Sequence, residues 1–436
     1  MKKEENYSGG ENFDLHKILL SGKTLNLKEK SRFFNVFTQD LNDNHELLCM
    51  RCITTTADRE VEIFDPYKGK NEKMLMFGSN NYLGLANHPY VKEKAAKVIE
   101  KFGAGIGGPP LLNGYTSLHK ELEERLAALK KTEDALIFSS GYGANVGLIS
   151  GLMNENSRVL YDAYSHASFC DGIKLSGVQS FRFPHNNLAV LENRLKNLKI
   201  SSSNDIYVGV EGVYSMDGDL APLDKIVALC KEYNAYLIVD DAHGTGVMGK
   251  RGRGSCEHFN IDGNVDFIMG TFSKTFAVTG GFITATKEII NYLRYFARSY
   301  MFSASLPPVT IAIVLAGLDV MENEPQLLQS LQDNINYTAS KLSALGFSVN
   351  NETAIFPLLV PAGMNIRKAA YEFHKRGIFV NSVEYPAVPL SQQRFRISIM
   401  ATHKKEDINK LAEVIEEVWN NYKESDSGLK LNLNAA

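Results

Sequence analysis

One lysine stands in a setting that suits chemistry on an aldehyde. Lys274 follows an apolar, strand-like run at residues 265–269, and an earlier apolar run ends at Asp240, with His243 close behind it. A lysine amine in such a place can condense with the aldehyde of pyridoxal 5'-phosphate (PLP) to form a Schiff base. An aspartate such as Asp240 would keep the pyridine nitrogen protonated, which makes the ring an electron sink. These residues predict a PLP site.

A phosphate site is predicted where residues 139–145 follow a strand and open a helix. The first four backbone N–H groups of a helix lack partners within it, and the helix dipole favours an anion there. Gly141 lets the backbone approach such an anion closely. The segment with Ser140, Gly141 and Tyr142 is therefore expected to bind the cofactor phosphate.

Two further strand ends carry polar side chains. His166 follows one expected strand, where its ring could lie flat against the pyridine; a hydrogen-bonded structural histidine is the alternative. Glu211 ends another strand, and both Glu211 and Ser215 could face the cofactor. Ligands gather at the carboxyl ends of strands in open α/β sheets, so polar residues at four such ends predict one shared site.

The elements that must position these residues alternate along the chain. Short apolar runs separated by helical periodicity are typical of a mostly parallel sheet covered on both faces. We expect an α/β fold with a large, mostly parallel seven-stranded sheet domain and a smaller C-terminal α+β domain. The expected strands are residues 135–138, 158–161, 180–183, 206–211, 236–240, 267–270 and 281–284. The expected division is an N-terminal extension at 1–60, a large PLP-binding domain at 61–310, a small domain at 311–422 and a polar tail at 423–436.

The segments outside the sheet also carry clear patterns. Residues 61–64 and 74–77 flank a turn and predict a hairpin. Helical spacing of apolar residues predicts helices at 90–102 and 118–129, a helical stretch over 308–345, and a helix at 408–418.

The composition excludes several classes of protein. With 44% hydrophobic and 22% charged residues, the 436-residue chain is typical of a globular protein, and its net charge of −3 gives no reason to expect nucleic acid. No apolar stretch is long enough to span a bilayer and the N-terminus is polar, so a cytoplasmic location is expected, with peripheral membrane contact left open. Cys49 and Cys52 form an isolated C-x-x-C without a second ligand pair, so neither zinc nor another metal is expected.

One further motif is misleading. Residues 103–108 match G-x-G-x-x-G, but a helix is expected before them, and Pro109 and Pro110 follow. A dinucleotide site needs a strand before that loop and a helix directly after it. We therefore expect a turn or flexible loop here, near the active site, and no nucleotide site.

Taken in order, these motifs resemble the α-oxoamine synthases, a family of fold-type I PLP-dependent acyltransferases. The similar segments are residues 79–85, 166–168, 240–243, 270–274 and 301–306, within a stretch from about residue 60 to 420. The resemblance implies a condensation of an amino acid with an acyl thioester, with release of carbon dioxide. It also implies a homodimer with a shared active site.

The resemblance assigns roles around the cofactor ring. Lys274 would form the Schiff base and later accept the α-proton of the amino acid, for which burial must lower its pKa. Asp240 would pair with the pyridine nitrogen and His243 would contact the ring oxygen. His166 would stack on the ring and is a candidate for polarising the acyl carbonyl.

It also assigns residues to the phosphate and to the substrate. Gly141, Tyr142 and Thr271 would contact the phosphate, and Ser303 and Ala304 would reach it across a dimer interface. By the same resemblance, the substrate carboxylate would be clamped by Asn80 and Arg396.

Within the family, several segments most resemble the bacterial serine palmitoyltransferases: residues 270–274, 300–305, 379–389 and 399–403. Pro110 stands where many members have an arginine, which favours an aliphatic acyl group over a dicarboxylic one. Serine with a long-chain acyl thioester, either acyl-CoA or an acyl carrier protein thioester, is therefore the expected pair. The alternatives are cysteate as in sulfonolipid synthesis, glycine with acetyl-CoA, simple transamination, and a non-catalytic partner subunit.

Overall fold

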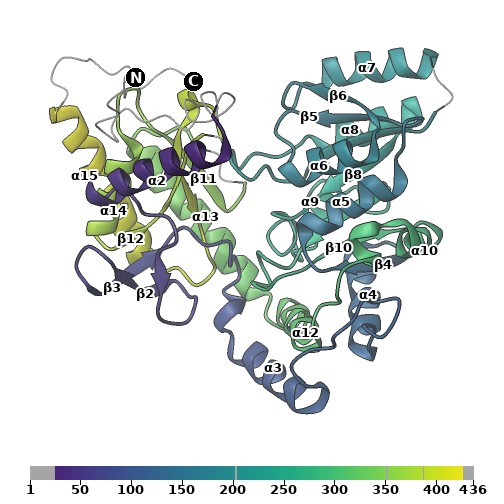
Figure 1. Cartoon of the computed structure of the whole chain (residues 1–436), viewed down its shortest axis with the longest axis horizontal. Coiled ribbons are helices and arrows are strands. Elements are labelled where there is room, and N and C mark those ends of the chain that lie inside the picture. The colour runs from purple at the N-terminus through teal and green to yellow at the C-terminus, as the bar shows by residue number, and fades with distance from the viewer. Residues whose placement is uncertain (1–24, 202–203, 350–351, 386, 426–436) are drawn as a thin grey trace.

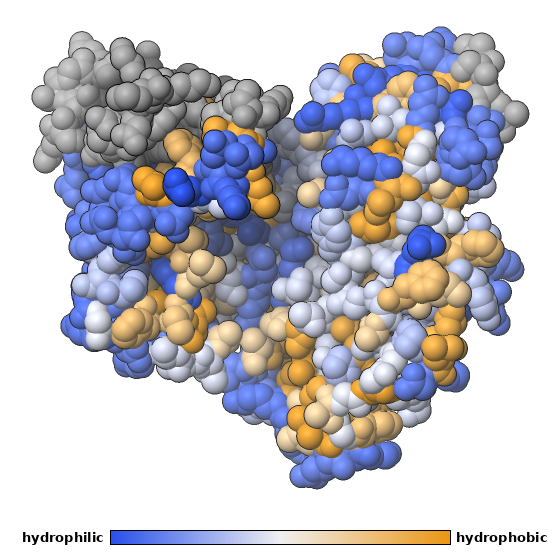
Figure 2. Space-filling view, viewed as in Figure 1, coloured by the Kyte–Doolittle hydropathy of each residue, from blue (hydrophilic) through white to orange (hydrophobic). Residues whose placement is uncertain are grey.

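The structure is a computed structural model that describes residues 25–201, 204–349, 352–385 and 387–425. Figure 1 shows two lobes that meet towards the bottom of the view. Figure 2 shows, in the same orientation, a hollow between the upper parts of the two lobes. Each lobe is built on its own sheets, and the functional residues come from both.

The first lobe is built on a seven-stranded sheet in the order β4-β10-β9-β8-β7-β5-β6. Its strands are β4 (Asp134–Phe138), β5 (Arg158–Asp162), β6 (Gln179–Phe183), β7 (Ile206–Glu211), β8 (Tyr236–Asp240), β9 (Phe267–Thr271) and β10 (Gly281–Ala285). Neighbours pair in parallel from β9 to β6, whereas β10 runs antiparallel to both β9 and β4. The seven strands and the mostly parallel sheet predicted from the sequence are confirmed.

Helices cover both faces of this sheet, which is why its strands are apolar almost throughout. In β8, Leu237 and Val239 pack into one core while Ile238, between them, packs into another. The helices of this lobe are α4 (Ser117–Lys130), α5 (Gly141–Leu152), α6 (Ala167–Ser176), α7 (Leu188–Ser201), α8 (Leu223–Tyr233), α9 (Ser255–His258), α10 (Lys287–Phe296) and α11 (Arg298–Met301).

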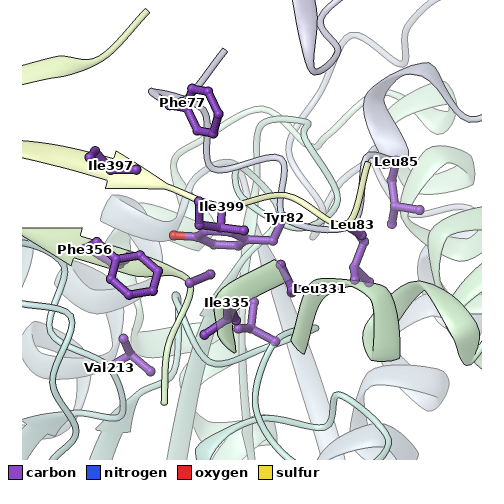
Figure 3. Packing of buried hydrophobic residues seen from close by; sticks show 14 of the residues in the cluster. Phe77, Tyr82, Leu83, Leu85, Val213, Leu331, Ile335, Phe356, Ile397 and Ile399 are labelled. Atoms are coloured by element: carbon purple, nitrogen blue, oxygen red, sulfur yellow. The ribbon is translucent and has the colours of Figure 1, made fainter. Parts of the chain in front are cut away.

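The second lobe is α+β, as expected. Its strands are β11 (Ile355–Leu359), β12 (Ile378–Phe379), β13 (Asn381–Val383) and β14 (Arg394–Ser398), and its helices are α13 (Gln326–Ala344), α14 (Ile366–Lys375), α15 (Lys405–Ser425) and the short η3 (Leu390–Gln392). Strand β14 lies between β11 and β13. Figure 3 shows Phe356 and Ile397 of this sheet in one apolar cluster with Phe77 and Tyr82, which come from a much earlier part of the chain. That packing fixes the segment around Asn80 against β14.

The predicted hairpin is confirmed, but its partner strand was not foreseen. It is formed by β2 (Glu60–Asp65) and β3 (Lys70–Met76), with β1 (Cys52–Ile53) on its outer edge. Strand β3 pairs in parallel with β12, so the hairpin joins a sheet of the second lobe. The predicted domain boundaries, which assign the hairpin to the large domain, stay predictions. In the described part of the extension, from residue 25 on, the chain forms helix α2 (Leu27–Asp43).

The helical stretch predicted over 308–345 is two helices. The first, α12 (Pro308–Asn323), ends before Glu324, and α13 starts directly after Pro325. Proline disfavours a helical conformation in the residue before it, and Glu324 has φ −124° and ψ 58°. Helix α12 packs against α3 (Pro89–Phe102).

The glycine-rich segment at 103–108 follows helix α3, which the short η2 (Leu85–Asn87) precedes. It therefore lacks the preceding strand that a dinucleotide site requires, as the sequence predicted. None of the helices in the described residues is both long enough and apolar enough to cross a bilayer.

Candidate active site

A cavity of about 320 Å³ lies at the carboxyl ends of the central strands of the large sheet. Most of the predicted cofactor-binding residues line it: Ser140, Gly141, Tyr142, His166, Glu211, Ser215, Asp240, His243, Thr271 and Lys274. Ser139, Ser168 and Ser273 also line it and were not predicted to do so. Residues from the ends of five strands, β4, β5, β7, β8 and β9, therefore meet at one place, where an open α/β sheet collects its ligands.

One side of the cavity is the start of α5. Ser140 is the N-cap residue, and its hydroxyl accepts a hydrogen bond from the Gly143 N–H at 2.9 Å. A Cβ atom on Gly141 would lie 2.8 Å from the hydroxyl oxygen of Thr271, so only glycine fits without a shift. The backbone amides at the start of the helix and the hydroxyl groups of Ser140 and Thr271 make this side of the cavity suitable for a phosphate.

Asp240 ends β8 and is 6% exposed. Its carboxylate accepts hydrogen bonds from the Asn145 amide at 2.7 Å and from the Ala242 N–H at 3.1 Å. Asn145 lies on α5 and is fully buried. The aspartate is thus oriented by partners on two different elements, which is the arrangement needed to hold a protonated ring nitrogen.

Lys274 is partly buried in the loop after β9. Burial lowers the pKa of its amine, the carboxylates of Asp240 and Glu211 oppose this shift, and the positive charge of Arg396 adds to it. A lowered pKa means that more of the amine is neutral near neutral pH, as a nucleophile or a base requires. The loop turns back sharply at Gly280, which has φ +129° and lies against the Phe272 ring.

Glu211 ends β7, and in the pairing of β7 with β8 it lies opposite Asp240. It is 4% exposed, and its Oε1 atom has no hydrogen-bond partner among the described residues. Burial, followed by the charge of Asp240, raises its pKa well above the ordinary value. A neutral, partly unsatisfied carboxyl group that lines a cavity is suited to a hydrogen bond with a bound molecule.

His166 caps the start of α6. The Ser168 N–H donates to its Nδ1 atom at 3.2 Å, and the Ser168 hydroxyl lies 2.7 Å from the same atom. Because Nδ1 accepts the backbone N–H, a neutral His166 carries its proton on Nε2. The Ser168 hydroxyl also accepts a hydrogen bond from Asn145 at 2.9 Å, which links His166 to Asp240 through α5.

His243 and Tyr82 form a pair at the side of the cavity. The Tyr82 hydroxyl lies 2.7 Å from His243 Nδ1 and 3.2 Å from the Asn80 side-chain oxygen. Burial and the positive charges of Lys274 and Arg396 lower the pKa of His243 well below its ordinary value, so the imidazole is neutral. Burial raises the pKa of Tyr82 to about 12, so its phenol keeps its proton.

The predicted clamp residues Asn80 and Arg396 lie together. Arg396, on β14, is 6% exposed and donates from Nη2 to the Asn80 side-chain oxygen at 3.0 Å. Its Nε atom has no partner among the described residues. A buried guanidinium with a free donor is suited to a carboxylate, which it can bind with two parallel hydrogen bonds.

Ser303 and Ala304 do not line this cavity. They follow α11 and border a separate, much smaller recess together with Pro110 and Tyr115. Both are partly or fully exposed on the surface of the chain. Their predicted contact with a phosphate across a dimer interface concerns a second copy and stays a prediction.

Three residues that complete the site were missed by the sequence reasoning: Asn145, Ser168 and Tyr82. Each stands within a motif that was recognised, at 139–145, 166–168 or 79–85. Their side chains contact the predicted residues instead of lying at a strand end themselves. Proximity to a predicted residue in the same motif was therefore the one signal available.

The cavity fits PLP by the chemistry of its donors. It offers helix-start amides for a phosphate, a lysine for an aldehyde, an oriented aspartate for a ring nitrogen and an unsatisfied carboxyl group. No group of three or more His, Cys, Asp or Glu residues in the described part of the chain could hold a metal ion. Cys49 and Cys52 are exposed free thiols.

Comparisons with known proteins agree with this chemistry. Residues 72–415 match the family model for aminotransferases of class I and II. A serine palmitoyltransferase of Bacteriovorax stolpii is 42% identical over 378 residues, which cover 86% of this chain and 88% of that protein. An 8-amino-7-oxononanoate synthase of Petrotoga mobilis is 38% identical over 370 residues, or 85% of this chain and 93% of that protein. A structure described as SPT with a PLP internal aldimine superposes with a TM-score of 0.84 at 31% identity, covering 91% of this chain and 99% of the other.

Proposed function

Because the chain belongs to the aminotransferase class I and II family, and within it to the α-oxoamine synthases, we propose that it joins serine to a long-chain acyl thioester. The family assignment makes it a PLP-dependent acyltransferase that uses an amino acid and an acyl thioester. The observation that carries the proposal is the joint position of Lys274 and Arg396. The lysine lines the cavity, while the arginine lies close enough for its charge to lower the lysine pKa.

Arg396 would hold the carboxylate of the amino acid. Its guanidinium has a free Nε donor and is oriented by Asn80, so an incoming carboxylate would complete its hydrogen bonds. Asn80 is in turn fixed through the Tyr82 hydroxyl, which contacts His243 beside the ring site. The amino group and the α-carbon of the substrate would thereby be directed towards Lys274.

Lys274 would move the proton of the α-carbon. Its Nζ atom has a lowered pKa and can therefore accept a proton near neutral pH. When bound, PLP supplies an aldehyde for the substrate amine and a ring that withdraws electrons from the bond being broken. Asp240 would hold the proton on the ring nitrogen, since its carboxylate is oriented by Asn145 and Ala242.

His166 would act on the second substrate. Its Nδ1 atom is occupied by the Ser168 N–H, so the Nε2–H is the group that is left to donate. A hydrogen bond from Nε2 to the acyl carbonyl oxygen would draw charge onto that oxygen as the new carbon–carbon bond forms. The thiol of the acyl donor leaves as this bond forms, and the carboxyl group of the amino acid is then lost as carbon dioxide, which gives an aminoketone.

Serine and an aliphatic acyl chain are the favoured substrates for two reasons. The Bacteriovorax stolpii relative, which is 42% identical, is named serine palmitoyltransferase. Pro110 also lies in the loop where the resemblance places an arginine in many members, and a prolyl ring offers no cation to a second carboxylate.

A second candidate deserves its own test because its relatives are nearly as similar. The Petrotoga mobilis protein is named for a product that carries a carboxylate at the far end of its chain. An acyl donor with a second carboxylate would serve such a product. Cysteate or glycine in place of serine are further alternatives for the amino acid.

The test is a spectral titration of the PLP-loaded enzyme with serine, glycine, alanine and cysteate, followed by product analysis. We expect saturable changes in visible absorption with serine, and carbon dioxide release with palmitoyl-CoA or a palmitoyl carrier protein. Faster turnover with alanine and a dicarboxylic acyl thioester would overturn the serine assignment in favour of the second candidate. Keto-acid formation without carbon dioxide would indicate transamination instead.

We also propose that two copies assemble so that Ser303 and Ala304 of one complete the cavity of the other. Phe302, directly before them, is 69% exposed, and Leu112, two residues after Pro110 of the same recess, is 82% exposed, which is unusual unless another surface covers these side chains. Mixing two inactive variants, Lys274→Ala and Ala304→Glu, should restore part of the activity, since a mixed dimer has one intact site. No recovery after mixing and refolding would contradict a shared site.

A further inference from the structure

The loop at residues 213–220, here called the bracket loop, joins the two lobes beside the active site. It leaves β7 directly after Glu211 and its ends pair through an isolated bridge between Val213 and Leu220. Inside it, the Gly218 N–H donates to the Tyr214 carbonyl oxygen at 2.8 Å. The loop is thus a tight, internally bonded turn whose outward groups are free to contact both lobes.

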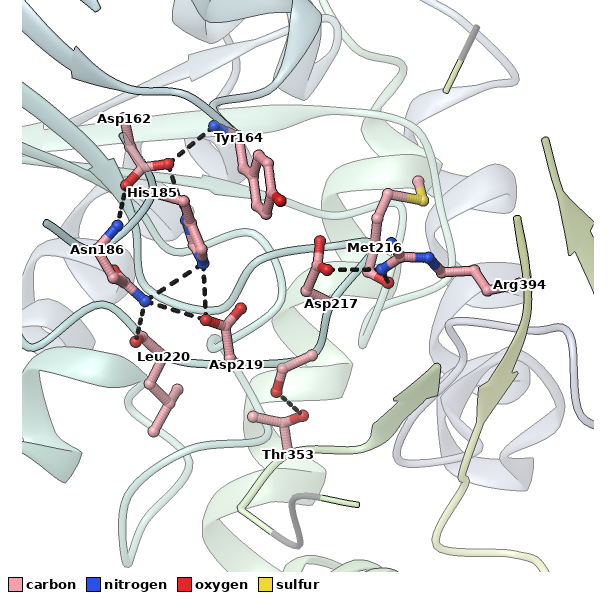
Figure 4. Close-up of polar contacts among 11 residues, drawn as sticks. Asp162, Tyr164, His185, Asn186, Met216, Asp217, Asp219, Leu220, Thr353 and Arg394 are labelled. Atoms are coloured by element: carbon pink, nitrogen blue, oxygen red, sulfur yellow. Dashed lines mark hydrogen bonds and ion pairs between the residues drawn. The ribbon is translucent and has the colours of Figure 1, made fainter. Parts of the chain in front are cut away.

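One side of the bracket loop is held by the first lobe. His185 lies between two carboxylates, with Nε2 2.8 Å from Asp219 and Nδ1 2.9 Å from Asp162 (Figure 4). Burial lowers the pKa of His185, but the two carboxylates outweigh it and raise the pKa to about 9, so the imidazole is charged at neutral pH. The Asn186 amide adds hydrogen bonds to Asp219 at 3.0 Å and to the Leu220 carbonyl oxygen at 3.1 Å.

This anchor is continuous with the segment that carries His166. The Tyr164 N–H donates to Asp162 at 2.8 Å, and the Tyr164 ring stacks on His185 with 4.2 Å between ring centroids. His166 follows two residues after Tyr164 and lines the cavity. The position of the bracket loop is therefore tied to the wall of the cavity in the first lobe.

The other side of the bracket loop is held by the second lobe. Arg394 donates to the Asp217 carboxylate at 2.6 Å and to the Met216 carbonyl oxygen at 3.1 Å (Figure 4). The Thr353 hydroxyl donates to the Gly218 carbonyl oxygen at 2.6 Å. Gly218 has φ +70°, and a Cβ atom there would lie 2.4 Å from a backbone oxygen of β11, so the loop lies directly against this lobe.

Arg394 and Arg396 share one strand and one face. They are two residues apart on β14, and side chains two apart in a strand point the same way. Arg394 is 3% exposed and points to the bracket loop, while Arg396 binds Asn80. The contacts of Arg394 with the bracket loop therefore help to hold the short strand that also carries Arg396.

We propose that Asp217 is a positioning residue: by holding Arg394, it sets where Arg396 stands relative to the cavity and so controls the affinity for the amino acid. Asp217 does not line the cavity, so it acts through the strand and not on the substrate. The inference rests on the proposed function, in which Arg396 holds the substrate carboxylate. Simple attachment of two lobes is the competing explanation.

The test compares Asp217→Asn with a second variant on the same side of the loop, Thr353→Val, which removes one hydrogen bond at nearly constant volume. The control is Glu372→Gln, whose carboxylate also pairs with an arginine, Arg376, but at the C-terminal end of helix α14. We expect Asp217→Asn to raise KM for the amino acid about tenfold, the effect of weakening one charge-assisted contact, with kcat changed less than about twofold. Thr353→Val should raise KM by a smaller factor, and the control should leave KM unchanged.

Two results would overturn the proposal. An unchanged KM in both Asp217→Asn and Thr353→Val would show that the loop does not position Arg396. A lower unfolding midpoint with an unchanged KM would show that the loop only attaches the lobes. Arg396→Ala separates this inference from the function it rests on: if that variant leaves KM unchanged, the carboxylate clamp itself is wrong, whatever Asp217 does.

Discussion

Asp240 and Glu211 end neighbouring strands and stand opposite each other in register, yet the fold surrounds their carboxyl groups differently. Asp240 receives hydrogen bonds from Asn145 and Ala242. Glu211 keeps one oxygen without a partner among the described residues, and its pKa is raised well above the ordinary value. Adjacent acids whose environments differ in this way can do different work at one pH. We infer that Asp240 holds the ring nitrogen, while Glu211, whose raised pKa favours its protonated form, donates a hydrogen bond to a bound molecule.

A related contrast lies between polar groups that are already joined by hydrogen bonds and polar groups that could gain a hydrogen bond from a ligand. His166, Ser168 and Asp240 are joined through the Asn145 Nδ2 group in one hydrogen-bonded network before anything binds, although Asn145 Oδ1 has no partner among the described residues. Arg396, like Glu211, is buried with a donor or acceptor left over. Buried polar groups are rarely left unpaired without a functional reason. The first set positions the reaction, and the second set recognises what enters.

The largest effect is expected at Lys274, the lysine that lines the cavity beside both acids. Lys274→Ala should abolish turnover and the visible absorption of bound PLP, because no other described lysine lines the cavity. Lys97→Ala, at an exposed lysine on α3, is the matched control and should change neither. Activity within tenfold of the wild type in Lys274→Ala would remove this lysine from the chemistry.

The next effect contrasts the two acids directly. Asp240→Asn keeps the size of the side chain but removes its charge, so the ring nitrogen would lose its anionic partner. Breaking a buried charge pair costs on the order of 3–5 kcal/mol, which corresponds to a fall in kcat of roughly two to four decades if the loss falls on the transition state. Steady-state kinetics at saturating amino acid measures this. A fall of less than tenfold would contradict the assignment of Asp240.

A smaller effect is expected at Arg396, the residue proposed to bind the substrate carboxylate. Arg396→Ala should raise KM for the amino acid by about one to two decades, the loss expected for a charge-assisted hydrogen bond to a carboxylate, with a weaker effect on kcat. Titration of the visible absorption with serine measures the binding step separately. If kcat falls and binding is unchanged, Arg396 acts on the reaction and not on recognition.

The smallest effect on rate is expected for Glu211→Gln. The raised pKa of Glu211 favours its protonated form, and an amide has the same size and no charge, so kcat should change less than about threefold near pH 7. A loss comparable to that of Asp240→Asn would show that Glu211 acts as an anion and would erase the contrast between the two acids.

The raised pKa of Glu211 predicts the direction in which the stability of the folded chain changes with pH. The folded chain holds this proton above the ordinary pKa of 4.5, whereas the unfolded chain releases it. Stability from this group is therefore present below pH 4.5 and is lost as pH rises towards the folded-state pKa. In the cofactor-free protein, the unfolding midpoint of Glu211→Gln should gain on the wild type as pH rises above 4.5. A constant difference at all pH values would contradict the shift.

The sequence allowed much of the sheet to be predicted, because its signals are local. All seven strands of the large sheet read as short apolar runs, and Asp240, Glu211 and Lys274 follow such runs directly. Pairing of β3 with β12 could not be predicted, since it joins residues about three hundred positions apart and neither strand encodes its partner. The pairing of Asn80 with Arg396 came from the family resemblance and not from any pattern in the residues.

The side-chain partners of the site residues could not be predicted from the sequence either. Asn145 is an ordinary helix residue by its sequence, and only the packing of α5 on the sheet brings its amide to Asp240. One Glu211 oxygen lacks a partner among the described residues because no donor from elsewhere in the chain lies beside it. A local sequence pattern does not carry that information. Ser303 and Ala304 need a second copy before their predicted contact can form.

Chemical trapping of the Schiff base tests most directly whether Lys274 carries the cofactor. Reducing the PLP-loaded protein with borohydride fixes the cofactor on whichever amine carries it, and peptide mass analysis locates that residue. We expect a pyridoxyl phosphate mass on the peptide with Lys274 and on no other lysine. A label on a different lysine, or none, would contradict the assignment on which the proposed function depends.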